Sequence, residues 1–99
     1  MTDEDRIVWA AMFARTNMGQ EMPTADDIRR YRVAARHGTS LEAMVNMVCA
    51  SYIENQRDFD MFVEEARDWH LVFQTQPDDY ISSNWPKKQA VWEASDVSA

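Results

Sequence analysis

The chain has 99 residues, a formal net charge of −7, and hydrophobic side chains at 45% of its positions. A chain of this length forms one domain, and its apolar content suffices for a core without disulfides or metals. The acidic balance disfavours nucleic acid as a partner, because nonspecific affinity for phosphates comes from Lys and Arg side chains. We therefore expect a single domain over 1–99 that is not a general nucleic-acid binder.

The compartment is indicated by cysteine use and by the start of the chain. The single cysteine, Cys49, cannot form an intramolecular disulfide, so nothing indicates an oxidising compartment. Residues 1–5 are acidic where a secretory signal is basic, and the longest apolar run, 7–14, is too short to span a bilayer. We expect a cytoplasmic protein with no membrane association.

Capping signals predict two helices in the first part of the chain. Thr2 precedes three acidic residues, a pattern that predicts a helix running to about Met18. Thr24 predicts the start of a second helix over 25–37, which Gly38 ends in the left-handed cap position. Thr or Ser immediately after this glycine caps a third helix, so the second and third helices are neighbours.

An apolar ladder with spacings of three and four residues runs through 41–73. Its average period of three and a half residues is typical of a helix packed lengthwise on another helix. The stretch 54–58 interrupts the ladder with polar residues, but it contains no glycine or proline and the phase is kept across it. We predict one long helix, straight or kinked, over about 40–73; the alternative is that Asp58 caps a new helix.

The C-terminal quarter of the chain is more polar than the rest. Pro86 suits the first turn of a short helix over 87–94, and the residues beyond it are expected to fray. We therefore predict 77–99 as a partly ordered segment. Apolar residues alternate over 69–73, which leaves a short strand as the alternative to a wholly helical fold. The predicted fold class is all-α, a small bundle of three to four helices.

Two features favour a homodimer. Residues 7–14 are apolar on every side, although a surface helix buries only one stripe. This segment is either a central helix enclosed by its own domain or a helix that also contacts a second subunit. A continuous ladder helix would be roughly 50 Å long, too long for a compact domain. Asn55 would either fix its register against a partner helix or mark a kink in it. The candidate dimer seam consists of Val45, Val48, Tyr52, Asn55, Phe59 and Phe62.

The candidate partner-binding residues are three arginines on one helix face, three carboxylates on the outward face of the ladder, and two C-terminal tryptophans. They are Arg29, Arg32, Arg36, Asp60, Glu64, Asp68, Trp85 and Trp92. The carboxylates are either a solvated face or a surface that holds a basic partner or imitates a phosphate backbone. The arginines could bind an acidic partner, a phosphate or a second copy of the acidic face. The tryptophans either cover the core or anchor another protein.

Catalytic and ligand-binding motifs are not found. Cys49 and His70 would lie about 30 Å apart on a continuous helix, so they do not form a nucleophile–base pair, and Cys49 is interpreted as a core residue. His37 and His70 have no second histidine or cysteine at metal-ligand spacing. Residues 58–60 lack the glycine and glutamate of a calcium loop, and two glycines do not make a phosphate-binding loop. We predict no enzyme activity, cofactor or metal.

Residues 27–44, DIRRYRVAARHGTSLEAM, resemble the opening helices of a repressor-type helix-turn-helix. The resemblance implies a second tight turn and a recognition helix within a few residues of Met44. The ladder instead predicts uninterrupted helix over 45–53, and the whole-chain charge is of the wrong sign, so the family is not assigned. A dimeric DNA-binding regulator that uses the arginine face is the alternative function.

The leading hypothesis is a non-enzymatic, homodimeric helical protein that binds another protein and thereby inhibits or regulates it. In composition the chain resembles the small acidic proteins that phages and mobile elements use against host or defence machinery. The resemblance implies an inhibitor whose acidic surface occupies the basic groove of a nucleic-acid-binding partner.

Overall fold

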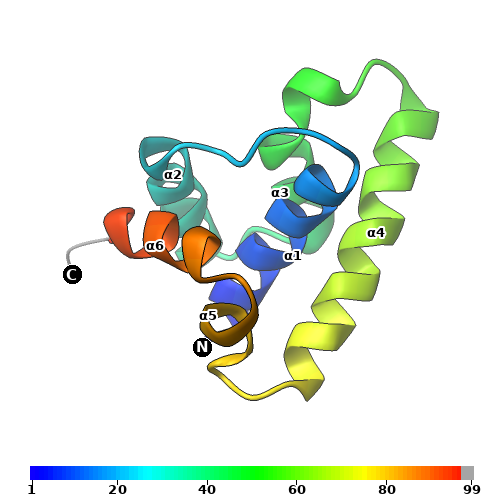
Figure 1. Ribbon diagram of the computed structural model, residues 1–99. Coiled ribbons are helices and arrows are strands. Elements are labelled where there is room, and N and C mark those ends of the chain that lie inside the picture. The colour runs from blue at the N-terminus through cyan, green and yellow to red at the C-terminus, as the bar shows by residue number, and fades with distance from the viewer. Residues whose placement is uncertain (97–99) are drawn as a thin grey trace.

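The computed structural model describes residues 1–96, which contain six α-helices, one short 3-10 helix and no strand. The elements are α1 (Asp3–Asn17), α2 (Ala25–Arg36), α3 (Leu41–Val48), η1 (Ala50–Tyr52), α4 (Gln56–Thr75), α5 (Tyr80–Asn84) and α6 (Pro86–Ala94) (Figure 1). The all-α prediction is confirmed, and 69–73 belongs to α4 rather than to a strand. The predicted number of three to four helices is too low for this part of the chain.

Helix α1 is the core of the molecule. Every residue from Val8 to Ala14 is buried, because α2, α3 and α4 all pack against this helix. Figure 1 shows α4 along one side of α1, with α2, α5 and α6 on the other. Trp9, Met12 and Phe13 are at most 2% exposed. The all-round apolar pattern therefore reflects a helix that its own chain encloses, which was the first of the two alternatives.

Three predicted helix starts are confirmed by side-chain caps. In each, a hydroxyl oxygen accepts a hydrogen bond from a backbone N–H three residues later, at 3.1 to 3.2 Å, in the pairs Thr2–Asp5, Thr24–Asp27 and Ser40–Ala43. These bonds satisfy N–H groups that have no partner inside the helix. Gly38, with φ +91°, follows α2 in the left-handed region where glycine carries no steric penalty.

The long helix predicted over 40–73 is wrong. Residues 49–55 form η1 and an irregular turn, and α4 then packs side by side with α3. Asn55, for which a register position and a kink were the two alternatives, lies at a full break and caps α4, since its Oδ1 accepts from Asp58 N at 2.9 Å. The Asp58 carboxylate accepts in turn from Glu54 N at 3.1 Å. This reciprocal cap starts a new helix without glycine or proline.

The ladder keeps its phase across the break because both halves pack on the same central helix. A continuous helix would protrude, whereas the folded chain extends 34 Å along its longest axis. Folding back at 49–55 buries Val45 on α3 and Phe62 on α4 in one cluster with α1. The gain in buried apolar area outweighs the few helical hydrogen bonds that the turn removes.

The C-terminal segment returns to the core. Helix α6 carries Pro86 at its first position, as the sequence predicts, and packs on α2. The indole of Trp92 stacks on that of Trp9, with ring centroids 4.6 Å apart. Trp85 is half-buried and meets Phe13 edge to face at 4.9 Å. The structure thus places both predicted tryptophans over the core. The last part of the predicted frayed tail, 97–99, lies outside the described residues.

Candidate interaction surfaces

Four arginines hold the C-terminal ends of helices elsewhere in the chain. The last carbonyls of a helix have no intrahelical donors and carry the negative end of its dipole, so a guanidinium is favourable there. The donor and carbonyl pairs, at 3.0 to 3.4 Å, are Arg6–Phe73, Arg15–Val48, Arg29–Ala94 and Arg32–Trp92. These four basic side chains are therefore engaged with the fold, although Arg29 among them remains exposed.

The three arginines predicted as one open face have different roles. Arg32 lies over the Trp92 ring, with its guanidinium carbon 4.2 Å from the ring centroid. Arg29 forms an ion pair with Asp26 at 2.7 Å besides its bond to α6. Arg36 is exposed and has no ion-pair partner in residues 1–96. Two of the three are therefore engaged with the fold, and only Arg36 points freely to solvent.

The helices that follow α2 differ from the prediction that was weighed against a helix-turn-helix. The prediction of uninterrupted helix over 45–53 is wrong, because α3 ends at Val48 and a turn follows before α4. The helix that follows, α4, begins at Gln56, twelve residues after Met44 rather than within the few that the resemblance implies. Its exposed side chains include Asp60, Glu64 and Asp68, whereas helices that read DNA present donors and basic groups to bases and phosphates. The charge argument against DNA binding still applies to this face.

The three predicted carboxylates lie on the exposed side of α4. Asp60, Glu64 and Asp68 follow at intervals of four residues, so they form a row with a rise of roughly 6 Å between neighbours. Met61 is 41% exposed and Leu71 62% exposed, and their spacing places them beside this row. We call these five residues the acidic face of α4.

Two arginines flank the acidic face. Arg67 turns away from it, because its Nη2 forms an ion pair with the Glu42 carboxylate of α3 at 2.8 Å. Arg57 is exposed and has no ion-pair partner in the part of the chain that the structure describes. The net charge of the exposed side of α4 is therefore negative.

The predicted seam residues do not form one line. Val45, Val48 and Phe62 are at most 4% exposed within a single chain, Tyr52 and Phe59 are half-buried, and Asn55 is an exposed cap. Three of the six side chains are thus covered without a second subunit. A dimer would have to use other surfaces, or the exposed edges of the half-buried rings.

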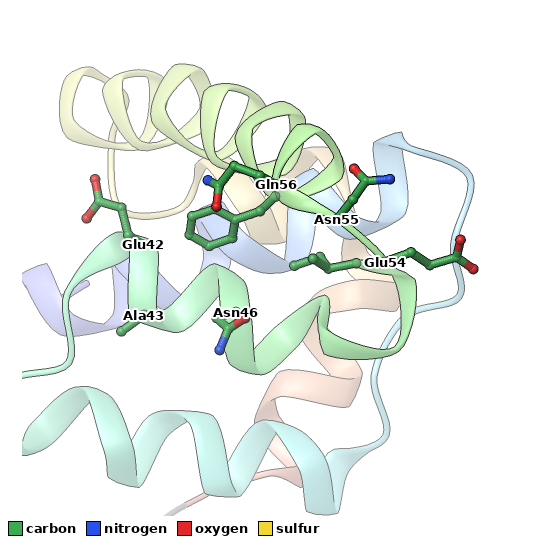
Figure 2. Close-up of a pocket in the computed structure, with 8 residues that line it drawn as sticks. Glu42, Ala43, Asn46, Glu54, Asn55 and Gln56 are labelled. Carbon is green, nitrogen blue, oxygen red and sulfur yellow. The ribbon is translucent and has the colours of Figure 1, made fainter.

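A groove of about 490 Å³ lies between α3 and the start of α4 (Figure 2). Its lining consists of Glu42, Ala43, Asn46, Ile53, Glu54, Asn55, Gln56 and Phe59. In Figure 2, Glu42 and Asn46 extend from α3, and Gln56 extends from the first turn of α4. The carboxylate of Glu54 and the amide of Asn55 point away from the groove at its outer end.

Some of the polar side chains that line this groove already form hydrogen bonds within the chain. The hydrogen bond from Arg67 holds the pKa of Glu42 below its usual value. Gln56 Nε2 donates to Asp60 Oδ1 at 2.9 Å, so the groove adjoins the acidic face of α4. No Lys or Arg lines it. Of the lining residues, sequence reasoning singled out only Asn55 and Phe59, and assigned both to a dimer seam. It missed the groove because the groove exists only where α3 and α4 fold together; the Asn55 and Asp58 capping pair was the signal for that fold.

A second hollow, of about 400 Å³, lies at the start of α6 and is lined by Asn84, Trp85, Pro86, Lys87 and Lys88. Burial lowers the pKa of Lys88, whose Nζ lies 5.6 Å from the centroid of the Phe13 ring. The Lys88 side chain therefore covers the aromatic core with its methylene stem while its ammonium faces the ring.

Cys49 is a core residue, as predicted. Its side chain is fully buried, with Sγ 3.9 Å from the Ala11 carbonyl oxygen. Burial raises the pKa of the thiol to about 12, so the reactive thiolate is scarce at neutral pH. Within residues 1–96 no group of three or more His, Cys, Asp or Glu side chains is arranged to hold a metal ion. None of the helices described is both long and apolar enough to cross a membrane.

The fold and these surfaces define an all-α protein built around a buried central helix. Compared with known protein families, curated proteins and solved structures, the chain gives no match.

Proposed function

We propose that this chain is a non-enzymatic protein-binding module that binds a basic segment of another protein and thereby inhibits or regulates it. The observation that supports the proposal is the acidic face of α4, where three exposed carboxylates stand in a row beside Met61 and Leu71. Single exposed apolar side chains are ordinary on protein surfaces. Leu71, at 62% exposure, is the most exposed large hydrophobic side chain in residues 1–96, and it lies next to this row of carboxylates.

The proposed partner segment carries Lys or Arg residues together with an apolar side chain. Carboxylates at the rim of an interface attract a basic partner and speed its association. Apolar side chains that become buried on contact supply most of the affinity. Such a surface fits a partner that binds nucleic acid, because the row of carboxylates can take the place of phosphates against the partner's basic side chains.

We expect charge reversal on α4 to weaken the binding of basic peptides. Peptides would be selected from a random displayed library on the wild-type protein, and their affinity measured for the triple variant D60K/E64K/D68K. We expect selected peptides to be rich in Lys and Arg, to bind more weakly as salt rises, and to lose at least about tenfold in affinity to the variant.

The matched control is the variant E21K/E93K/D96K, which makes the same change of net charge at exposed carboxylates outside α4. It should keep affinity within about threefold, because these carboxylates lie outside the acidic face of α4, and salt screens charges that do not contact the peptide. Both variants would be checked for native helix content by circular dichroism. Equal affinity for wild type and the α4 variant, or selection of peptides without basic residues, would contradict the proposal.

Homodimerisation stays a prediction. The structure encloses α1 within one chain and buries three of the six predicted seam residues, so any dimer would have to bury exposed side chains such as Leu71, Met61, Met47 or Val33. Light scattering coupled to size exclusion, over a wide dilution range, measures the mass directly. A stable mass near twice 11.6 kDa would support the dimer, and a mass near 11.6 kDa throughout would contradict it.

A further inference from the structure

We propose that the groove between α3 and α4 is the anchor site for one arginine side chain of the basic partner. This inference rests on the proposed function, because the groove adjoins the acidic face of α4 through the hydrogen bond from Gln56 to Asp60 at 2.9 Å. Beyond the proposed function, this inference specifies which partner side chain anchors the complex and where that side chain binds. A segment lying along α4 would pass this groove at the N-terminal end of the helix.

The apolar part of the groove matches the aliphatic stem and the flat guanidinium of arginine. Ala43, Ile53 and Phe59 line it, and the Phe59 side chain is half-buried, so part of it is accessible. Guanidinium planes stack on aromatic rings, and the three methylenes of the stem bury well against apolar side chains. The volume of about 490 Å³ has room for such a side chain together with retained water.

The rim of the groove offers acceptors. Gln56 uses its Nε2 as a donor to Asp60, and this leaves its Oε1 to accept a hydrogen bond. The Asn46 amide forms no hydrogen bond within residues 1–96 and is exposed beside the groove. The Glu42 carboxylate already accepts from one guanidinium, that of Arg67, through Oε1 at 2.8 Å, and its second oxygen remains available.

Charge and geometry together favour arginine over other side chains. The charged residues in the lining are both acidic: Glu42 faces the groove, and Glu54 lies at its outer end with its carboxylate directed outward. Asp60 adds a third carboxylate beside Gln56. An acidic side chain would be repelled, and a neutral apolar one would leave the rim acceptors without donors. Lysine supplies one compact, strongly hydrated ammonium, whereas arginine presents five N–H groups in a plane that can meet acceptors on both helices.

The test is a nuclear magnetic resonance titration of the full chain, labelled with ¹⁵N, with N-acetyl-arginine amide as the probe. We expect saturable shifts of the side-chain amides of Asn46 and Gln56, with a dissociation constant of roughly 1 to 10 mM for so small a ligand. The lysine analogue should bind at least about threefold more weakly. The citrulline analogue, which has the same shape without charge, should give no saturable shift at these two amides.

Two variants separate binding in the groove from general attraction to an acidic protein. The substitution Ala43→Leu fills the groove from an exposed position of α3, is compatible with a helix, and should abolish the localised shifts. Arg67→Ala frees the Glu42 carboxylate and should strengthen arginine binding by roughly threefold or more. Equal responses to arginine and citrulline, or unchanged shifts in A43L, would overturn the proposal.

The result of the arginine titration does not depend on the result of the peptide-binding experiment. The probe is a single amino-acid derivative, so the groove can bind it even if charge reversal on α4 leaves peptide binding unchanged. In that case the proposed role of the acidic face in peptide binding is wrong, and the arginine site in the groove is still supported. If peptides bind the acidic face but A43L binds them as well as the wild type does, the arginine anchor is wrong and the proposed function stands.

Discussion

Replacing Phe13 with alanine is expected to lower the free energy of unfolding by about 4 kcal/mol. The ring is 2% exposed in the centre of an aromatic cluster. It meets the rings of Trp69, Trp85 and Phe73 edge to face, with centroids 4.7, 4.9 and 5.1 Å away. Such ring contacts stabilise the protein beyond what the buried apolar area alone contributes. The cavity left by truncation is lined by large rigid rings, which cannot move in to fill it.

This loss is a large part of the stability of a domain of this size, which is of the order of 5 to 15 kcal/mol. Urea unfolding followed by tryptophan fluorescence measures it, since Trp69 and Trp85 report on the same cluster. Phe13→Leu is the control, because it keeps most of the volume, and should cost about half as much. A cost below about 1.5 kcal/mol for Phe13→Ala would mean that the cluster is not the centre of the core.

Replacing Trp92 with alanine is expected to destabilise the protein by about 3 kcal/mol and to release the C-terminal segment from the core. The indole stacks on Trp9 at 4.6 Å and lies under the Arg32 guanidinium at 4.2 Å. Without it, Arg32 keeps its bond to the residue 92 carbonyl only as long as α6 remains in place. Helix α6 has few other long-range neighbours, chiefly on α2.

Hydrogen exchange measures this second effect by segment. Amides of α5 and α6 should lose protection by more than those of α4, because the segment opens locally before the core does. Trp92→Phe is the matched control; it retains a stacking ring, so it should keep more than half of the lost stability and most of the protection. Equal loss of protection in all helices would instead show that the segment and the core unfold as one unit.

Local signals predicted the first half of the fold well. A capping hydroxyl such as Thr24 forms its bond to an N–H only three residues away, so its effect needs no knowledge of the tertiary structure. The same holds for Gly38, because φ +91° is a local conformational requirement. The seven consecutive buried residues of α1 could likewise be recognised as an unusual helix, though not whether one chain or two enclosed it.

The break after α3 shows where such reasoning ends. The ladder phase is continuous through 54–58 because both halves meet the same central helix, and periodicity alone does not distinguish one long helix from two that fold back on a shared core. The Asn55 and Asp58 pair was present in the sequence, but its capping role competes with helix continuation, and burial against α1 decides between them.

The roles of the charged residues follow the same division. Composition and spacing determined that the chain is acidic, that Asp60, Glu64 and Asp68 share a helix face, and that the fold is helical; each depends on local sequence or on a sum over the chain. Tertiary structure decided which charges remain at the surface, since Arg29 and Arg32 reach α6 from 65 and 60 residues earlier. It also decided that α3 and α4 enclose a groove. Long-range contacts of this kind depend on where the chain folds back, and that is set by the total apolar area buried on α1 rather than by any local pattern.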